Sequence, residues 1–315
     1  MYEANRDVAL FLGLALMWAP LGYAANQTYT SPGDAKPLKL PATVSTISVS
    51  VFGAGGGGGA GGASFNAVLK GRGAGGGGGG SGATLVCNVS VTPGSTVLIT
   101  VGEPGKGGKV TSGTGDKGGT GGVSSIHIQE PGGSVSALTL SASGGEGGTG
   151  GSASNGFTNT PGVGGSAGKS QAAPDCGLGV GGTGLAGGAN GSEMPGQGAA
   201  PDPVEAARLA AVIRTRKAEP ARADRIMRLD RIETPGAVSP TEYLNVSQQI
   251  AREAQADSDA LDAANAADIS RAALCAKAGA GGSGGKGASV NSSSGGINAH
   301  FDGSPGNPGC VSIDY

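Results

Sequence analysis

Apolar and polar residues alternate with a period of two in several short segments, and each of these segments predicts a β-strand. In residues 44–52, Ile47, Val49 and Val51 share one face of the predicted strand, while Ser48 and Ser50 share the other. The same alternation occurs in residues 84–91, 96–101, 123–129, 135–141 and 309–315. The pattern therefore predicts a mainly β protein.

Turn sequences separate two pairs of these strands. Thr92-Pro-Gly-Ser95 follows residues 84–91, and Glu130-Pro-Gly-Gly133 follows residues 123–129. Proline presets φ at the first turn position and glycine accepts a positive φ, so both pairs are expected to form β-hairpins. Cys87 falls on the apolar face of the first pair and is expected to point into the core.

Glycine tracts separate the predicted strands and make up much of the chain, which has 66 glycines and only 3% aromatic residues among its 315 residues. The main tracts are residues 53–63, 71–82, 102–122 and 144–198. An eight-residue polyglycine-II helix would span about 25 Å, close to the length of an eight-residue strand. We therefore expect tracts that pack beside the strands in polyglycine-II form, forming a small β-hub; flexible linkers are the alternative.

Residues 201–278 differ sharply in composition, with 11 Lys/Arg, 12 Asp/Glu and one glycine. Asp202-Pro203 and Ser239-Pro240 are helix-start signals, and Gly279 suits a C-cap. Helices are predicted near 203–218, 220–233 and 240–278. Basic residues concentrate in 214–231 and acidic residues in 233–268, which favours an inserted antiparallel α-helical hairpin. A partner-binding arm and a flexible linker are the alternatives.

The first 24 residues indicate export. Residues 8–22 are apolar and Gly22-Tyr23-Ala24 is a small-x-small cleavage pattern, so a signal peptide over 1–24 is expected, with an uncleaved anchor as the alternative. The apolar run is too short to span a membrane comfortably, and Pro20 interrupts it. The protein is thus expected to be secreted or at the cell surface. The predicted organisation is 1–24 signal peptide, 25–43 extended lead-in, 44–200 first glycine-rich part, 201–278 helical insertion and 279–315 closing glycine-rich part.

Four cysteines occur, at Cys87, Cys176, Cys275 and Cys310. In an exported protein this even number predicts two disulfides, although the sequence leaves three pairings open. Four free buried thiols are the alternative.

The charged and nucleophilic residues form no pattern of a catalytic or metal centre. The net charge of −2 argues against nucleic acid as a partner. Gly168-Lys169-Ser170 lacks the first glycine of a P-loop, because Val163 stands there, and the only two histidines, His127 and His300, are expected to be structural or solvent-facing. We therefore expect no enzyme activity, cofactor or metal, and no membrane span after signal cleavage.

Several of these segments resemble the glycine-rich domain of phage tail-fibre adhesins and related exported bacterial proteins. The resemblance rests on Val51-Phe-Gly-Ala54 with the polyglycine after it, on 79–84, on 91–102, on 118–125 and on the closing Pro308-Gly-Cys-Val-Ser-Ile-Asp-Tyr315. It implies a β-hub with packed polyglycine-II helices whose loop tips touch host-surface receptors. The signal peptide, cysteines and helical insertion indicate a cell-exported relative.

The expected function is that of an adhesive module that contacts a cell-surface protein or glycan. The contact residues are expected where larger side chains interrupt the glycine: Phe65, Asn66, Lys106, Lys109, Asp116, Lys117, Phe157 and Asn159. The alternative is a self-assembling, fibre-forming extracellular protein. An ice- or mineral-binding surface is less favoured, because no regular Gly-x-x repeat is evident in the tracts.

Overall fold

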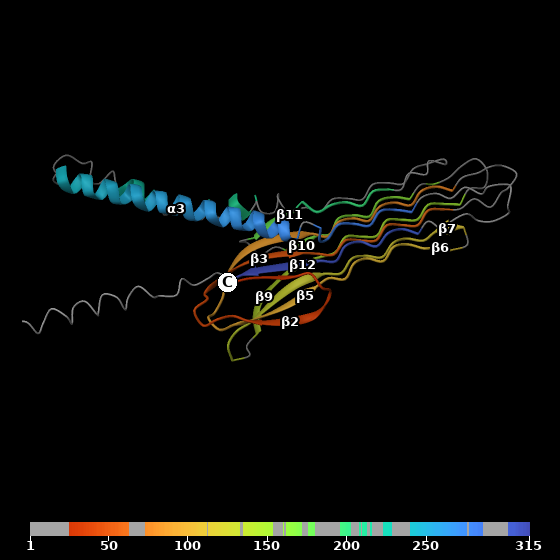
Figure 1. Cartoon of the computed structure of the whole chain (residues 1–315), viewed down its shortest axis with the longest axis horizontal. Coiled ribbons are helices and arrows are strands. Elements are labelled where there is room, and N and C mark those ends of the chain that lie inside the picture. Colours follow the sequence, from red (N-terminus) through yellow and green to blue (C-terminus); the bar gives the residue numbers. More distant parts are fainter. Residues whose placement is uncertain are drawn as a thin grey trace, which may run out of the picture.

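The computed structural model describes residues 25–62, 73–111, 113–132, 135–153, 160, 162–171, 176–179, 196–202, 208, 210–212, 215, 223–228, 240–275, 277–285 and 302–315. These residues form two antiparallel sheets, a bundle of extended glycine-rich segments that leaves one end of the sheets, and a long helix that points the opposite way (Figure 1).

The first sheet has the strand order β1-β12-β3-β4-β11. Its members are β1 (Asn26–Tyr29), β12 (Cys310–Asp314), β3 (Thr46–Phe52), β4 (Thr84–Ser90) and β11 (Cys176–Gly179). The second sheet has the order β10-β9-β8-β5-β2. It contains β10 (Ser170–Gln171), β9 (Val135–Ala142), β8 (Ser124–Gln129), β5 (Thr96–Val101) and β2 (Gly33–Lys39).

The two sheets enclose one apolar core, to which both contribute alternate residues. Val49 and Val51 of β3 and Ile126 of β8 are at most 1% exposed and belong to this cluster. Because a strand directs successive side chains to opposite faces, the period-two alternation places this set inside. The predicted strands at 44–52, 123–129, 135–141 and 309–315 are confirmed as β3, β8, β9 and β12, and β8 pairs with β9 as predicted.

The hairpin predicted across Thr92–Ser95 is wrong, although both of its strands exist. β4 pairs with β3 and β11 in the first sheet, whereas β5 pairs with β2 and β8 in the second. The turn residues do bend the chain: Gly94 has φ +77°, and Ser95 donates its N–H to the Thr92 carbonyl at 3.0 Å. A tight turn can join two strands of one sheet or carry the chain from one sheet to the other. Here it carries the chain between the sheets, because β4 and β5 can then each bury their apolar face in the shared core.

The region expected to be an extended lead-in contributes an edge strand to each sheet. β1 pairs with β12, and β2 pairs with β5 through a register shift between Gly33 and Lys36. Pro37 lies in β2, at the sheet edge where a missing N–H is tolerated. These strands lack a clean apolar alternation, which explains why the sequence pattern misses them.

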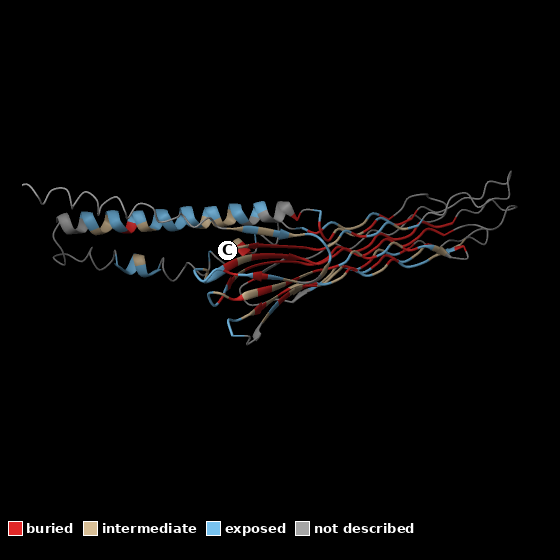
Figure 2. Cartoon of the chain, turned by 60° about the horizontal axis from the view of Figure 1, so that its bottom comes forward, coloured by how far each residue is buried: buried red, intermediate tan, exposed pale blue. Residues whose placement is uncertain are grey.

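Helix α3 (Pro240–Leu274) begins at the predicted proline and ends four residues before Ala278, the expected last helical residue. Gly279 has φ +71°, the left-handed conformation expected of a residue that ends a helix, but it comes after turn residues at 275, 277 and 278. Residues 208, 210–212, 215 and 223–228 are also helical. Ala210 packs on Val86 of β4, on the outer face of the first sheet. Figure 2 shows that most of α3 is exposed.

The glycine-rich segments continue the strands. β3, β5 and β9 run into the bundle, and β4, β8, β10 and β12 emerge from it. Within residues 53–62 the backbone N–H groups donate to three neighbouring segments in turn, at N···O distances of 2.8–3.1 Å. Residues three apart, such as Gly53, Gly56 and Gly59, donate to the same segment. These three neighbours are 73–83, 116–122 and 302–309.

The carbonyls of residues 53–62 accept from three further segments, 102–109, 143–152 and 279–285. The six described neighbours also bond to one another in a closed ring, so residues 53–62 form the axis of the bundle. Residues 73–83 are a second axis, bonded to 53–62, 143–152, 162–169, 196–199 and 279–285. The two central segments are the ones that consist almost entirely of glycine.

Candidate functional site

The interior of the bundle cannot hold a binding site, because it is closely packed and the only side chains of its described residues are a few alanines and Ser81. Residues 53–62 and 73–83 are all buried. A Cβ added at Gly57, Gly58 or Gly79 would lie closer than 3.0 Å to a backbone carbonyl of an adjacent segment. Such a separation is not compatible with close packing. Any ligand must therefore meet the bundle at its outer surface or at its far end.

The far end is where pairs of antiparallel segments meet. Gly62 donates to Ala74, Ser152 donates to Thr160, and Gly303 donates to Gly108, so the ends of these segments lie in one layer. The short ladder of β6 (Val110–Thr111) and β7 (Thr114–Gly115) lies at the same end (Figure 1). Four of the predicted contact residues, Phe65, Asn66, Phe157 and Asn159, lie outside the described residues.

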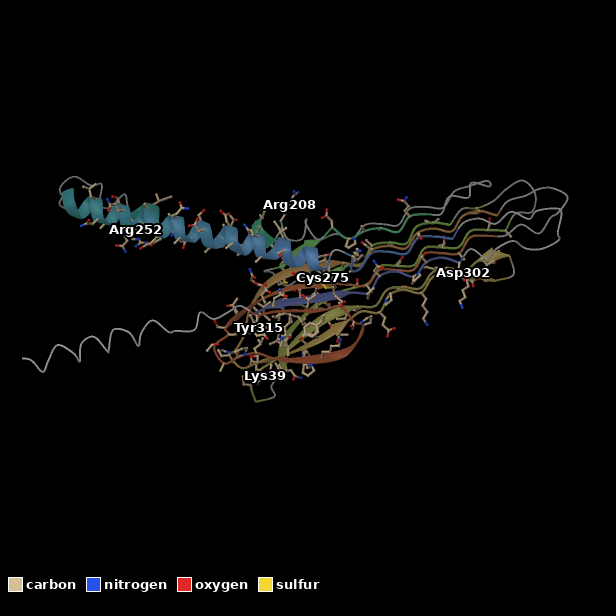
Figure 3. The ribbon with its side chains drawn as sticks, viewed as in Figure 1. Lys39, Arg208, Arg252, Cys275, Asp302 and Tyr315 are labelled. Carbon is tan, nitrogen blue, oxygen red and sulfur yellow. A yellow bond between two sulfur atoms is a disulfide. The ribbon has the colours of Figure 1, made fainter. Side chains whose placement is uncertain are left out.

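The other four predicted contact residues lie on two adjacent segments of the bundle. Lys106 and Lys109 are on 102–109, Asp116 and Lys117 are on 116–122, and all four are exposed. Asp116 donates its backbone N–H to the Lys109 carbonyl at 2.8 Å. The structure therefore brings these residues together on the outside of the bundle. Asp302, labelled in Figure 3, joins them from a third segment, accepting the Val110 N–H at 3.2 Å.

Two disulfides are present, as predicted, and their pairing is Cys87–Cys176 and Cys275–Cys310. The first joins β4 to β11 within the sandwich core. The second joins the end of α3 to the first residue of β12, with a Cα–Cα distance of 5.9 Å. Phe52 and Ala278 pack around it. This second disulfide fixes the point where the chain leaves the helix and re-enters the bundle.

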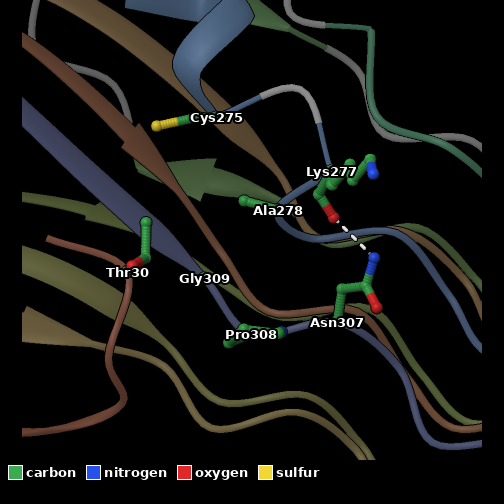
Figure 4. Close-up of a pocket in the computed structure, with 7 residues that line it drawn as sticks. All are labelled: Thr30, Cys275, Lys277, Ala278, Asn307, Pro308 and Gly309. Carbon is green, nitrogen blue, oxygen red and sulfur yellow. Dashed lines mark hydrogen bonds between the residues drawn. The ribbon is translucent and has the colours of Figure 1, made fainter. Parts of the chain in front are cut away.

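A cavity of about 310 Å³ lies beside the second disulfide. It is lined by Thr30, Cys275, Lys277, Ala278, Asn307, Pro308 and Gly309. In Figure 4 the Asn307 amide donates to the Lys277 carbonyl, a bond of 2.6 Å that joins the two sides of the junction. The remaining lining is mostly backbone and small side chains, and it presents no set of groups suited to catalysis.

The ionisable groups of the described residues also form no evident catalytic or metal site. Among the described residues, no cluster of three or more His, Cys, Asp or Glu side chains is placed to hold a metal ion. His127 contacts Thr139 across two strands, with Nδ1 and Oγ1 2.9 Å apart. Burial raises the pKa of Tyr29, and the nearby Tyr315 adds to the rise. Within the part of the chain that the structure covers, none of the helices has the length and apolarity needed to cross a membrane.

The sequence does contain a signal for the bundle surface that the initial interpretation missed. Outer segments repeat with a period of three, as in 144–152, which read Gly-Gly-Glu-Gly-Gly-Thr-Gly-Gly-Ser. Residues 118–123 and 281–286 follow the same Gly-Gly-x form. The expectation that no such repeat exists is therefore wrong. A side chain at one position in three is what a threefold segment with one solvent-facing side allows.

Comparison with protein families agrees with this architecture. The model of a glycine-rich domain family matches residues 30–315, which include every described strand except β1, the bundle and the helical region. The chain belongs to this glycine-rich domain family. Comparison with curated proteins finds no match.

Proposed function

We propose that the protein is a non-enzymatic, exported surface protein that acts as an adhesive module, with a stiff glycine bundle holding its contact residues away from the sandwich. The observation that carries this proposal is the convergence of antiparallel segments at one end of a bundle whose interior consists of backbone and a few small side chains. In such a bundle the glycines form a stiff, extended interior, and the residues with larger side chains lie on the outside and at the far end.

The glycine segments are proposed to be polyglycine-II helices. The period of three in their hydrogen bonds is the number of residues per turn of this helix, which has no internal hydrogen bonds and must bond to neighbours. Native-state hydrogen exchange across 53–62 and 73–82 tests this assignment. Strong protection is expected at both segments, whereas exchange at the rate of an unstructured chain would show that they are linkers.

The helical residues between 201 and 278 are proposed to form an antiparallel hairpin inserted between two bundle segments. Residues 196–199 and 279–285 are bonded neighbours in the bundle, so the chain leaves and returns at nearly the same place. Arg225 forms an ion pair with Asp257, and Arg228 with Glu253 at 3.3 Å. These pairs join residues 223–228 to α3 with the segregation of charge that the sequence predicts.

Export is proposed to follow cleavage after Ala24. The new N-terminus would be Ala25, whose backbone already pairs with Tyr315 in both directions at 2.8 and 3.1 Å. Cleavage there would leave both sheets complete. N-terminal sequencing of protein collected outside the cells should begin at Ala25; retention of the full leader on cell-associated protein would contradict the proposal.

Adhesion is tested by measuring how labelled mature protein binds to a panel of intact cells. Alanine replacement of the eight predicted contact residues, Phe65, Asn66, Lys106, Lys109, Asp116, Lys117, Phe157 and Asn159, is expected to reduce binding. Alanine at the exposed α3 residues Asn245, Asp259 and Asp262 is the matched control and should leave binding unchanged. Equal binding by all three proteins would refute contact through these residues.

Self-assembly by addition of further glycine segments is not favoured by the surface. Each outer segment of the bundle carries a side chain at about every third position, as Lys106 and Lys109 illustrate. Such side chains occupy the place where another backbone would have to approach, in the way that charged residues protect the edges of sheets. Light scattering after size-exclusion chromatography is expected to show no concentration-dependent growth.

A further inference from the structure

The hydrogen bonds of the bundle define three stacked layers. The two axial segments, 53–62 and 73–83, lie in the middle layer with 102–109. One outer layer is the row 116–122, 143–152 and 162–169, in which each segment bonds to the next. The opposite outer layer is the row 302–309, 279–285 and 196–199. The bundle is thus a slab with two broad faces, and 102–109 forms one narrow side.

The first broad face carries a regular array of side chains. Residues with side chains in 143–152 lie beside residues with side chains in 162–169. Glu146 donates its N–H to the Ser166 carbonyl and Thr149 donates its N–H to the Val163 carbonyl, both at 2.9 Å. Gly118 and Gly121 of the third segment donate to Gly148 and Gly145, which brings Lys117 and Thr120 to the same two levels.

In each of the three segments, the third residue of the Gly-Gly-x repeat faces outward. A Cβ at Gly118 or Gly121 would meet the axial segment, and one at Gly144 or Gly147 would meet 116–122. In 116–122 and 143–152 the third position of each repeat is the one with room for a side chain, and 162–169 follows the same form apart from Ala167. We define the hydroxyl array as the twelve residues at these positions: Thr114, Lys117, Thr120 and Val123; Ser143, Glu146, Thr149 and Ser152; Thr160, Val163, Ser166 and Lys169.

The hydroxyl array has a low net charge, and the hydroxyl groups of its middle row are held in place. Successive members of one row are three residues apart, or about 9 Å at the rise of a polyglycine-II helix. The middle row is fixed by the neighbouring backbone: the hydroxyl oxygens of Thr149, Ser152 and Ser143 accept the N–H groups of Val163, Thr160 and Lys169 at 2.6–2.7 Å. Seven of the twelve residues are Ser or Thr and three are charged. Short, fixed side chains lose little freedom on binding.

We propose that the hydroxyl array binds the surface of an insoluble, neutral polysaccharide, in which parallel sugar chains present hydroxyl groups at repeated spacings. This proposal rests on the adhesive role proposed above, and it adds a second contact surface with a stated partner; the two surfaces share Lys117. A hydroxyl group can donate to and accept from sugar hydroxyls. In the middle row, Ser143 and Thr149 already donate to the carbonyls of Lys169 and Val163, so these two would only accept from a sugar. The net charge of +1 from Lys117, Lys169 and Glu146 offers little attraction to a polyanion.

The array has no aromatic side chain and no cavity that could enclose one sugar unit. Each contact would therefore be weak, and affinity would come from the simultaneous engagement of many sites on a flat partner. It follows that a packed polysaccharide solid should be bound and a short soluble oligosaccharide should not. The opposite face serves as the control, because its described outward residues include Ser304, Ser283 and Gln197.

The test is co-sedimentation of the full-length mature protein with microcrystalline cellulose and with chitin, with alginate gel as the anionic comparison. Thr120→Lys, Val163→Lys and Ser166→Lys together place three long side chains on the array. Gln197→Lys, Ser283→Lys and Ser304→Lys place the same charge on the opposite face. All six positions are exposed, and circular dichroism with thermal unfolding verifies that both variants fold.

We expect the wild type and the opposite-face variant to sediment with cellulose or chitin, and the array variant to bind at least about tenfold less. The proposal fails if the wild type binds neither solid, if the array variant binds as well as the wild type, or if alginate is preferred. Ice shaping that is lost only in the array variant, without polysaccharide binding, would assign the face to ice instead. Cell binding that persists without polysaccharide binding would leave the adhesive function standing and remove this inference alone.

Discussion

The β-sandwich and the glycine bundle are built from the same continuous segments, but they are stabilised in different ways. In the sandwich, Val51 and Ile126 illustrate a core of apolar side chains that is nearly free of solvent contact. In the bundle, residues 53–62 are equally buried but present only backbone and two alanines, and nine of the ten N–H groups donate to a carbonyl of another segment. Burial in the first region removes apolar surface from water; burial in the second is possible only because backbone groups are paired.

This difference teaches that burial does not set tolerance to mutation in the same way in both regions. A core side chain can be shortened, at the cost of a cavity and lost contacts. A central glycine can be changed only to something larger, and the nearest atoms are backbone carbonyls that cannot rotate away. We therefore expect the bundle to be the less tolerant region, and the following predictions compare the two.

The largest effect is expected from Gly57→Val in the central segment. Its Cβ would lie closer than 3.0 Å to the Lys106 carbonyl, so the adjacent segment would have to move. We expect a loss of more than about 4 kcal/mol in the free energy of unfolding, measured by denaturant titration. Thr120→Val, at an exposed position of the same bundle, is the control and should change stability by less than about 0.5 kcal/mol. A small loss at Gly57 would show that the segments are not closely packed.

The next effect concerns the joint between the two regions. Replacing Cys275 and Cys310 by serine removes a link between residues 35 apart, and we expect a loss of about 3 kcal/mol. Hydrogen exchange should rise first in 279–285, because the disulfide holds the entry of that segment to the bundle. Faster exchange confined to the sandwich strands would contradict this assignment.

A smaller effect is expected for a conservative change in the sandwich. Ile126→Val removes one methylene from a fully buried side chain, which should cost about 1 kcal/mol. Ile126→Ala should cost about 3 kcal/mol with the same cooperative transition. A smaller loss of unfolding free energy for Ile126→Val than for Ile126→Ala, together with the large loss for Gly57→Val, would establish the contrast between the sandwich and the bundle. Equal losses for valine and alanine would show that Ile126 is not closely packed.

The smallest effect is expected in the helical region, which belongs neither to the sandwich nor to the bundle. Arg225 and Asp257 form an ion pair in which the carboxylate side chain is 60% exposed. A double-mutant cycle with Arg225→Gln and Asp257→Asn should give a coupling of about 0.5 kcal/mol that weakens with added salt. A coupling above about 2 kcal/mol would mean that this pair is far better shielded than its exposure indicates.

Much of the local structure follows from the sequence alone. Period-two alternation determined β3, β8, β9 and β12, since only a strand places Ile47, Val49 and Val51 on one face. The proline after Ser239 and the run of alanine and charged residues determined where α3 begins. The number of cysteines determined that two disulfides could form. The excess of glycine also determined that any ordered, extended tract must bond to other segments, because an extended segment makes no backbone hydrogen bonds within itself.

The tertiary structure decided which segments become neighbours. It separated 84–91 and 96–101 into different sheets, where each apolar face finds a larger partner, and it paired Cys87 with Cys176. It brought residues 116–122, 143–152 and 162–169 into one face, so that Thr120, Glu146 and Ser166 share a level. Glycine carries no side chain to encode a preferred neighbour. The order of segments in the bundle is therefore set by the sheet from which each one continues and by the register of backbone hydrogen bonds, which only the folded chain defines.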